Sequence, residues 1–131
     1  MKNHSEENIY KDIFESFLDL YVRCDLQGRI TMASPSVKSM LGYTTEDIIG
    51  ADITNYYLFN SRTKRLYQSL LKKKSITNFE IALTSKGGKI IPCICNIRLL
   101  FDANGKPSEL ECICRDVTKL VETHEELEKA I

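Results

Sequence analysis

The 131-residue sequence lacks tryptophan, an excess of charge of either sign and any long apolar run. Its 18 basic and 18 acidic residues cancel, so the chain has no long-range field to draw it to nucleic acid or an anionic membrane. No stretch approaches the roughly 20 apolar residues of a membrane span. The polar start MKNHSEEN is unlike a signal peptide. We therefore expect one soluble, cytoplasmic domain without nucleic-acid or membrane contacts.

Catalytic motifs are missing as well. The chain has no G-x-x-x-x-G-K phosphate loop, no H-E-x-x-H and no G-x-S-x-G. Asp12, Glu15 and Asp19 are spaced like one solvated helix surface, and Glu46 with Asp47 like the charged first turn of a helix. These patterns indicate a domain that is not an enzyme.

The cysteines are the most unusual feature, because four of the five form two C-I-C triplets in neighbouring segments. An odd number, without the spacing of a secreted disulfide scaffold, makes reduced thiols the default expectation. Alternate residues of a strand share a face, so each triplet turns both of its cysteines to one side of a sheet. Cys24, in the alternating stretch YVRCD, follows the same rule. The cysteine faces are expected to be the covered ones.

Hydrophobic periodicity divides the chain into helices, a hairpin and a meander of strands. A capped amphipathic pattern predicts a helix over 5–18, and YVRCD with RITMAS predicts a β-hairpin. Short helices follow from Pro35 onward, and three strands run from NFEIALT to SELECICRD. This order predicts an α+β fold, a five-stranded antiparallel sheet with its helices over one face. We divide it into an N-terminal helix (1–19), a core (20–117) and a C-terminal helix (118–131).

Three stretches resemble the PAS (Per-Arnt-Sim) sensor domain family. MLGYTTEDIIG is similar to the family's "LlGYs.eEliG" segment, KGGKIIPCICNI to its "dGr..pv.vs" strand, and RDVTKLVE to the "rDIT" ending before an output helix. Ser34 stands where many relatives carry asparagine, and we expect it to cap the helix after Pro35. The resemblance spans 9–131. It implies a PAS fold with strand order 2-1-5-4-3, from a bacterial or archaeal signalling protein.

This strand order implies that all five thiols line one patch beneath the helices. A four-residue DANG turn would pair Cys93 with Cys114 and Cys95 with Cys112 across the strands. Residues two apart on a strand lie about 6.6 Å apart, which is too far for thiolates sharing one zinc ion and disfavours a metal site. We favour small buried hydrophobes that leave room for a cavity. A thiol-based redox or metal sensor is the alternative.

The pocket implied by the resemblance is apolar, with one or two tyrosine hydroxyls at its rim. Its expected wall combines one face of the sheet with residues from the helices. These residues are Val22, Cys24, Ile53, Tyr57, Leu66, Leu70, Phe79, Ile81, Leu83, Cys93, Cys95, Ile97, Cys112 and Cys114. The same side chains could instead close into a packed core, as in relatives that act only as dimerisation and relay modules.

The resemblance also limits the cofactors. In the light-oxygen-voltage branch a cysteine on the short helix after the GY segment bonds the flavin, and Ile53 stands there. The amides that hold the flavin ring would fall near Leu83, Cys93 and Cys114, which cannot replace them. The haem branch needs a histidine on the long helix, and SRTKRLYQSLLKK has none. We expect no flavin adduct and no histidine-ligated haem, which leaves cysteine-ligated haem or an unknown small apolar ligand.

The N-terminal helix carries an apolar stripe that needs a cover. Ile9, Ile13 and Phe17 recur at helical spacing. Such helices commonly mediate dimers in the PAS family, so we expect a homodimer contact here. Docking of the helix on its own sheet is the alternative.

The C-terminal segment RDVTKLVETHEELEKAI predicts the signal-transfer element. Asp116 is expected to cap a helix that begins near Thr118, and Leu120, His124 and Leu127 continue the a/d seam of a two-stranded coiled coil. A helix folding back on its own domain is the alternative. The sequence thus predicts a homodimeric sensory or relay domain of a sensor histidine kinase or cyclic-dinucleotide enzyme, which passes its signal to an output domain.

Overall fold

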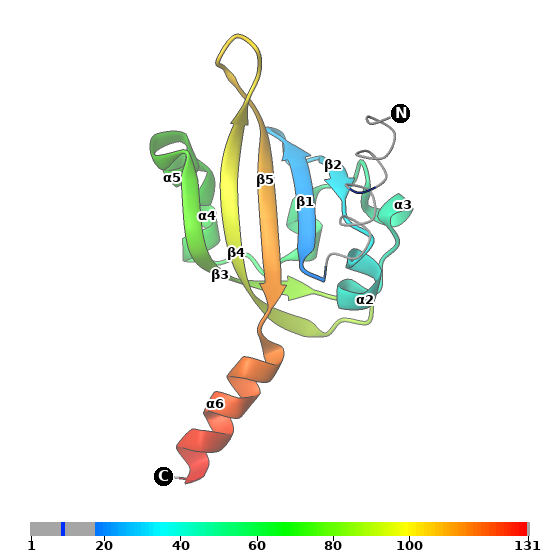
Figure 1. Cartoon of the computed structure of the whole chain (residues 1–131), viewed down its shortest axis with the longest axis vertical. Helices are drawn as coiled ribbons and strands as arrows, with labels where there is room; N and C mark the ends of the chain where they lie inside the picture. The colour runs from blue at the N-terminus through cyan, green and yellow to red at the C-terminus, as the bar shows by residue number, and fades with distance from the viewer. Residues whose placement is uncertain (1–8, 10–17, 131) are drawn as a thin grey trace.

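The computed structural model describes residue 9 and residues 18–130, and these form one antiparallel sheet with helices on one side (Figure 1). The strands are β1 (Leu20–Asp25), β2 (Ile30–Ala33), β3 (Ser75–Thr84), β4 (Ile90–Phe101) and β5 (Pro107–Asp116). They lie in the order β2-β1-β5-β4-β3, and every neighbouring pair is antiparallel. The predicted α+β class and strand order are confirmed.

Short helices connect β2 to β3 and lie on both sides of the central strands in Figure 1. They are α2 (Val37–Leu41), α3 (Thr45–Ile48), the 3-10 helix η1 (Ile53–Tyr56), α4 (Ser61–Lys64) and α5 (Leu66–Lys73). The last helix, α6 (Thr118–Ala130), continues from β5 and points away from the sheet. The long helix expected over SRTKRLYQSLLKK is broken at Arg65, which ends α4 and begins α5.

Local side-chain bonds explain why such short helices form. Thr44 and Asp47 make a capping box at the start of α3, and Asn60 with Thr63 makes another at α4. Each box satisfies backbone N–H groups that a helix start leaves unpaired. Gly42 ends α2 with φ 84°, a left-handed conformation that glycine adopts without steric cost.

The core lies between the sheet and these helices. Alternate residues of β4 are buried, from Ile91 through Cys93, Cys95 and Ile97 to Leu99. The helices contribute Val37, Leu41, Ile48 and Leu70, of which Val37 and Leu70 are completely buried. Because buried residues alternate with more exposed ones, the short helices between β2 and β3 cover the cysteine-bearing face of β4.

The opposite face carries a polar network centred on Glu111, which is 12% exposed. The Tyr21 hydroxyl donates to Glu111 Oε2 at 2.7 Å, and Arg23 Nε donates to the Tyr21 hydroxyl at 2.8 Å. Arg98 Nη2 pairs with Glu111 Oε1 at 3.1 Å. These contacts join β1, β5 and β4. Of the apolar stripe predicted for dimer contact, Ile9 is exposed, whereas Ile13 and Phe17 lie outside the described residues.

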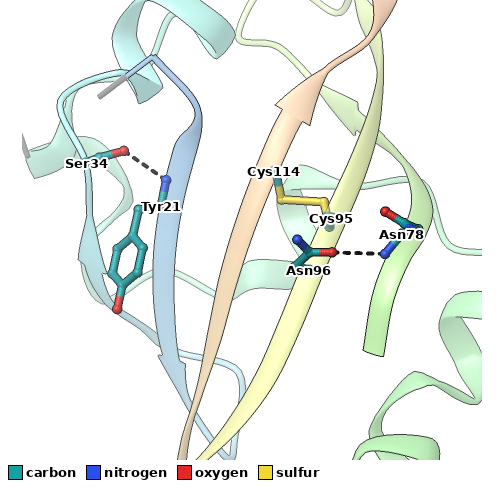
Figure 2. Close-up of a disulfide and its surroundings, with 6 residues drawn as sticks. All are labelled: Tyr21, Ser34, Asn78, Cys95, Asn96 and Cys114. Carbon is teal, nitrogen blue, oxygen red and sulfur yellow. Dashed lines mark hydrogen bonds between the residues drawn. A yellow bond between two sulfur atoms is a disulfide. The ribbon is translucent and has the colours of Figure 1, made fainter. Parts of the chain in front are cut away.

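Ser34 does not cap a helix, contrary to expectation. Its completely buried hydroxyl accepts a hydrogen bond from the Tyr21 N–H at 2.9 Å (Figure 2) and lies 2.6 Å from the Ser36 hydroxyl. The N-cap of α2 is Ser36, and its hydroxyl donates to the Asp19 carbonyl instead. The pair therefore fixes the start of β1 against the β2–α2 corner.

The expected pairing of the cysteines between β4 and β5 is wrong by two residues. Cys95 lies opposite Cys114, Ile97 opposite Cys112 and Cys93 opposite Asp116. The turn pairs Asp102 with Lys106 around Gly105 at φ 77°, and an irregularity between Leu100 and Phe101 shifts the register again. The turn between Phe101 and Pro107 has five residues rather than four, and the irregularity leaves Ser108 of β5 without an opposite residue, so each shifts the pairing by one residue.

We expect Ser34→Ala to lower the free energy of unfolding by about 1–3 kcal/mol, because the Tyr21 N–H and the Ser36 hydroxyl both lose a buried partner. Urea unfolding followed by circular dichroism measures the change. Ser61→Ala, at an exposed serine that lies away from this network, is the control and should change it by less than about 0.5 kcal/mol. Equal effects of the two variants would contradict the structural role of Ser34.

Candidate functional site

A cavity of about 160 Å³ lies between the covered face of the sheet and the helices. All the residues expected in its wall line it except Phe79 and Cys93. The Phe79 ring instead lies 5.5 Å beneath the Arg62 guanidinium carbon. Cys93 is buried nearer the end of β5, opposite Asp116. That the lining residues bind a ligand remains a prediction.

Sequence reasoning missed part of the cavity wall. The missed residues are Leu20, Ile30, Val37, Leu41, Ile48, Tyr56, Thr63, Tyr67 and Leu110. Strand alternation could have found Leu20 and Leu110, because each lies two residues from an expected wall residue. The contributions of α2 and α3 had no comparable signal, since helices this short have too few residues to define a face.

The wall is apolar, and its polar groups are few. Thr63 is buried, but its hydroxyl already donates to the Asn60 carbonyl and accepts from the Asn60 N–H. Burial raises the pKa of the Tyr57 hydroxyl, and nearby Asp52, Cys24 and Cys112 add to the shift. Tyr57 therefore stays neutral at physiological pH and can donate a hydrogen bond.

Four of the five cysteines line the cavity, and two of them are joined. A disulfide links Cys95 on β4 with Cys114 on β5 (Figure 2), across a Cα separation of 4.2 Å. Directly opposed residues of this kind reach disulfide distance without a change in backbone pairing. The expectation of five reduced thiols is therefore wrong for this pair. Cys24, Cys93 and Cys112 are free.

The three free thiols are strongly biased toward the neutral form. Burial is the main cause in each case, and it raises the pKa of Cys24 to about 11 and those of Cys93 and Cys112 to about 12. Cys112 keeps some exposed surface because it borders the cavity. A thiol in this state is a poor nucleophile and a poor metal ligand, since both roles need the thiolate.

The described residues contain no group of three or more histidine, cysteine, aspartate or glutamate side chains placed to hold a metal ion. Burial disfavours the thiolate form of all three free thiols, and zinc sites need several deprotonated ligands at about 2.0–2.3 Å. Likewise, no helix within residues 18–130 is both long and apolar enough to cross a membrane.

The end of β5 connects the cavity wall to α6. The Asp116 carboxylate accepts a hydrogen bond from the Thr118 N–H at 2.8 Å and so caps the helix, as the sequence predicts. The Val117 N–H donates to the Pro92 carbonyl at 2.9 Å, which ties the junction to β4. Cys114 in the wall is two residues from this cap. The cavity wall and the start of α6 are therefore joined by a short stretch of β5.

The predicted seam on α6 is exposed in the single chain. Leu120 and Leu127 are 66% and 60% exposed, and His124 makes a 3.0 Å contact with Glu128 on the helix surface. Val117 is partly buried at the base. The helix does not fold back over its own domain to cover Leu120 and Leu127, which leaves these apolar residues available to a partner.

Comparison with known proteins identifies the class. The PAS domain sequence profile matches residues 16–119, and this chain therefore belongs to the PAS domain family. No curated protein matches the chain.

Solved PAS structures share the fold. A PAS domain from Colwellia psychrerythraea has a TM-score of 0.78 at 22% identity, covering 87% of this chain and 98% of its own. The PAS domain of an HTR-like protein from Haloarcula marismortui scores 0.69 at 18% identity, covering 88% and 94%. A PAS domain from a two-component sensor histidine kinase scores 0.72 at 11% identity, covering 87% and 98%. PAS domains are generally sensory and regulatory modules.

We expect Cys24, Cys93 and Cys112 to react with iodoacetamide at least about 100-fold more slowly in the native protein than in urea, because their raised pKa values leave little thiolate near pH 8. Mass spectrometry of timed samples measures the labelling. The rate at Cys24 should rise as the pH approaches its pKa of about 11, where half of this thiol is ionised. Native labelling as fast as in urea would contradict the burial of these thiols.

Proposed function

We propose that this chain is a non-catalytic sensory or relay domain that detects an event at its cavity and passes it to α6. The observation that carries the proposal is the short connection between the two. β5 supplies Cys112 and Cys114 to the cavity wall, and the cap of α6 begins at Asp116. A ligand that displaces β5 thus acts directly on the helix start.

The signal leaves through paired α6 helices of a homodimer. Val117, Leu120, His124 and Leu127 advance by three, four and three residues, the spacing of a coiled-coil seam. The exposure of Leu120 and Leu127 supports this pairing, because a second helix would remove both from water. A dimer contact by the N-terminal stripe at Ile9, Ile13 and Phe17 is part of the same proposal.

The domain serves a bacterial or archaeal signalling protein, such as a sensor histidine kinase or a cyclic-dinucleotide enzyme, whose output domain follows α6. Similar folds in a sensor histidine kinase and in an HTR-like archaeal protein support this setting. The balanced charge supports the absence of nucleic-acid and anionic-membrane contacts, and a cytoplasmic location is part of the same proposal. The module regulates, and any catalysis belongs to the output domain.

Neither flavin nor histidine-ligated haem is part of the proposed mechanism. Ile53 borders the cavity where a flavin-bonding cysteine is expected from the resemblance. The cavity of about 160 Å³ is also below the roughly 300 Å³ at which sites for drug-sized ligands begin. A smaller, apolar ligand fits the wall better.

Redox sensing is the second candidate, and the disulfide favours it. In the oxidation, the Cys95 and Cys114 thiols lose two protons and two electrons as the sulfur–sulfur bond forms. A hydroperoxide as oxidant would accept them and leave as water and an alcohol. Because the bond joins β4 to β5 just before the junction, its oxidation state would act on the same helix start.

Interchain cross-linking tests whether the seam of α6 faces the same helix of a second copy. In a background with all native cysteines replaced by alanine or valine, and with folding checked by circular dichroism, Leu120→Cys and Leu127→Cys should form interchain disulfides at least about tenfold faster than Glu122→Cys and Lys129→Cys. All four positions lie on the exposed surface of α6, so they differ chiefly in the face they occupy. Equal rates at all four would rule out a parallel seam and relay by helix pairing.

Reduction with dithiothreitol is expected to lower the free energy of unfolding by about 3 kcal/mol, because the Cys95–Cys114 bond spans a sequence separation of 19 and restricts the unfolded chain. Urea unfolding of both forms, with thiols counted by mass spectrometry, gives the difference. Dithiothreitol should leave the free energy of unfolding of a Cys95→Val variant unchanged, because this variant cannot form the bond. An unreduced sample in which all five cysteines are alkylated in urea would count against the redox candidate.

A further inference from the structure

The cavity wall is rich in sulfur atoms and tyrosine rings, and these narrow the class of ligand. The inference rests on the proposed function, in which a ligand binds at this cavity. Four cysteines, Cys24, Cys95, Cys112 and Cys114, contribute sulfur to the side of the cavity formed by the sheet. Three tyrosines, Tyr56, Tyr57 and Tyr67, lie on the helical side. A ligand between them contacts polarisable sulfur on one side and aromatic rings on the other.

The volume limits the ligand to about one ring. At about 160 Å³ the cavity is close in size to an engineered protein cavity of about 150 Å³ that stays dry and binds benzene. A fused tricyclic or a porphyrin does not fit without large movement. Because the wall is apolar and the Thr63 hydroxyl is already engaged, a charged ligand would lose its hydration without compensation.

Sulfur and aromatic neighbours favour an aromatic ring over a saturated one of the same size. Sulfur atoms make favourable contacts with the edges of aromatic rings, and tyrosine rings prefer stacked or edge-on aromatic partners. Tyr43 and Tyr56 already adopt an edge-on arrangement beside the cavity, with ring centroids 5.1 Å apart. A saturated hydrocarbon gains the same release from water but makes none of these oriented contacts.

Access to the cavity lies on the helical side. The wall residues from the sheet are mostly buried, whereas Ile53 and Tyr56 on η1 and Leu66 on α5 are partly exposed. Tyr67 is 40% exposed although it borders the cavity. A small neutral molecule can therefore enter between η1 and α5 without any change in strand pairing.

We propose that the cavity is a binding site for neutral monocyclic aromatic molecules of the size of toluene or a simple phenol. The ring lies between the sulfur-bearing face of β5 and the tyrosines of η1 and α5. The neutral Tyr57 hydroxyl offers one hydrogen bond to a phenolic oxygen.

Toluene and methylcyclohexane, which carry the same number of carbon atoms, provide the test on the intact oxidised protein. Toluene should raise the melting temperature by about 3–6 °C at about ten times its Kd, and methylcyclohexane should bind at least about fivefold more weakly. Calorimetric titration gives the two affinities. Phenol is the second probe and should lose affinity in Tyr57→Phe.

Filled-cavity variants locate the binding. Cys112→Phe and the milder Cys112→Leu should abolish the response to toluene, since position 112 borders the cavity. Ile113→Phe, the adjacent residue on the other face of β5, should retain it. A response that survives in a folded Cys112 variant overturns the proposed site.

The aromatic-ligand inference and the proposed relay function fail by different results. Equal affinity for toluene and methylcyclohexane overturns the aromatic class and leaves a cavity that senses apolar molecules. No binding of either probe overturns the inference entirely, while the cross-linking of α6 still decides independently whether the domain relays a signal.

Discussion

The pairing of β4 with β5 is the constraint on which the rest of the structure depends. It places Cys95 opposite Cys114, so that a disulfide forms inside the cavity wall, and it brings Asp116 beside Cys93. The same pairing lets the Val117 N–H reach the Pro92 carbonyl and fixes where α6 begins. A slip of one residue would turn every cysteine of β5 to the polar face and would separate the cavity from the helix.

The cavity exists because the strands around it carry small side chains. Cysteine is a small apolar residue, and a sheet face with cysteine at alternate positions leaves space that leucine or phenylalanine would occupy. The short helices bring Val37, Leu70 and the tyrosines over this space without closing it. Burial keeps the free thiols of Cys24 and Cys112 neutral, so these two side chains add no charge to the cavity wall.

Local patterns in the sequence are sufficient for the strands and for most of the short helices, whereas the sheet order and the cavity wall were expected from the resemblance to PAS domains. Alternation assigns Cys112 and Cys114 to one face without any knowledge of partners. The register between β4 and β5 depends instead on the turn at Asp102 and on the irregularity near Phe101, whose geometry the letters DANGKP do not determine. For that reason the cysteine partners were mispredicted and the disulfide was not expected. The role of Ser34 was missed because its partner Tyr21 lies on another strand.

The network around Glu111 has a mechanical consequence. Glu111 lies directly opposite Arg23 on β1 and Arg98 on β4, and the Tyr21 hydroxyl donates to it from β1. The Glu111 carboxylate thereby links β1, β5 and β4 on the face away from the cavity. The disulfide links β4 and β5 on the cavity face. Strands held on both faces resist sliding past one another. A force from inside the cavity would therefore move the three central strands together as one rigid unit. Because α6 continues from β5, its orientation would change with theirs.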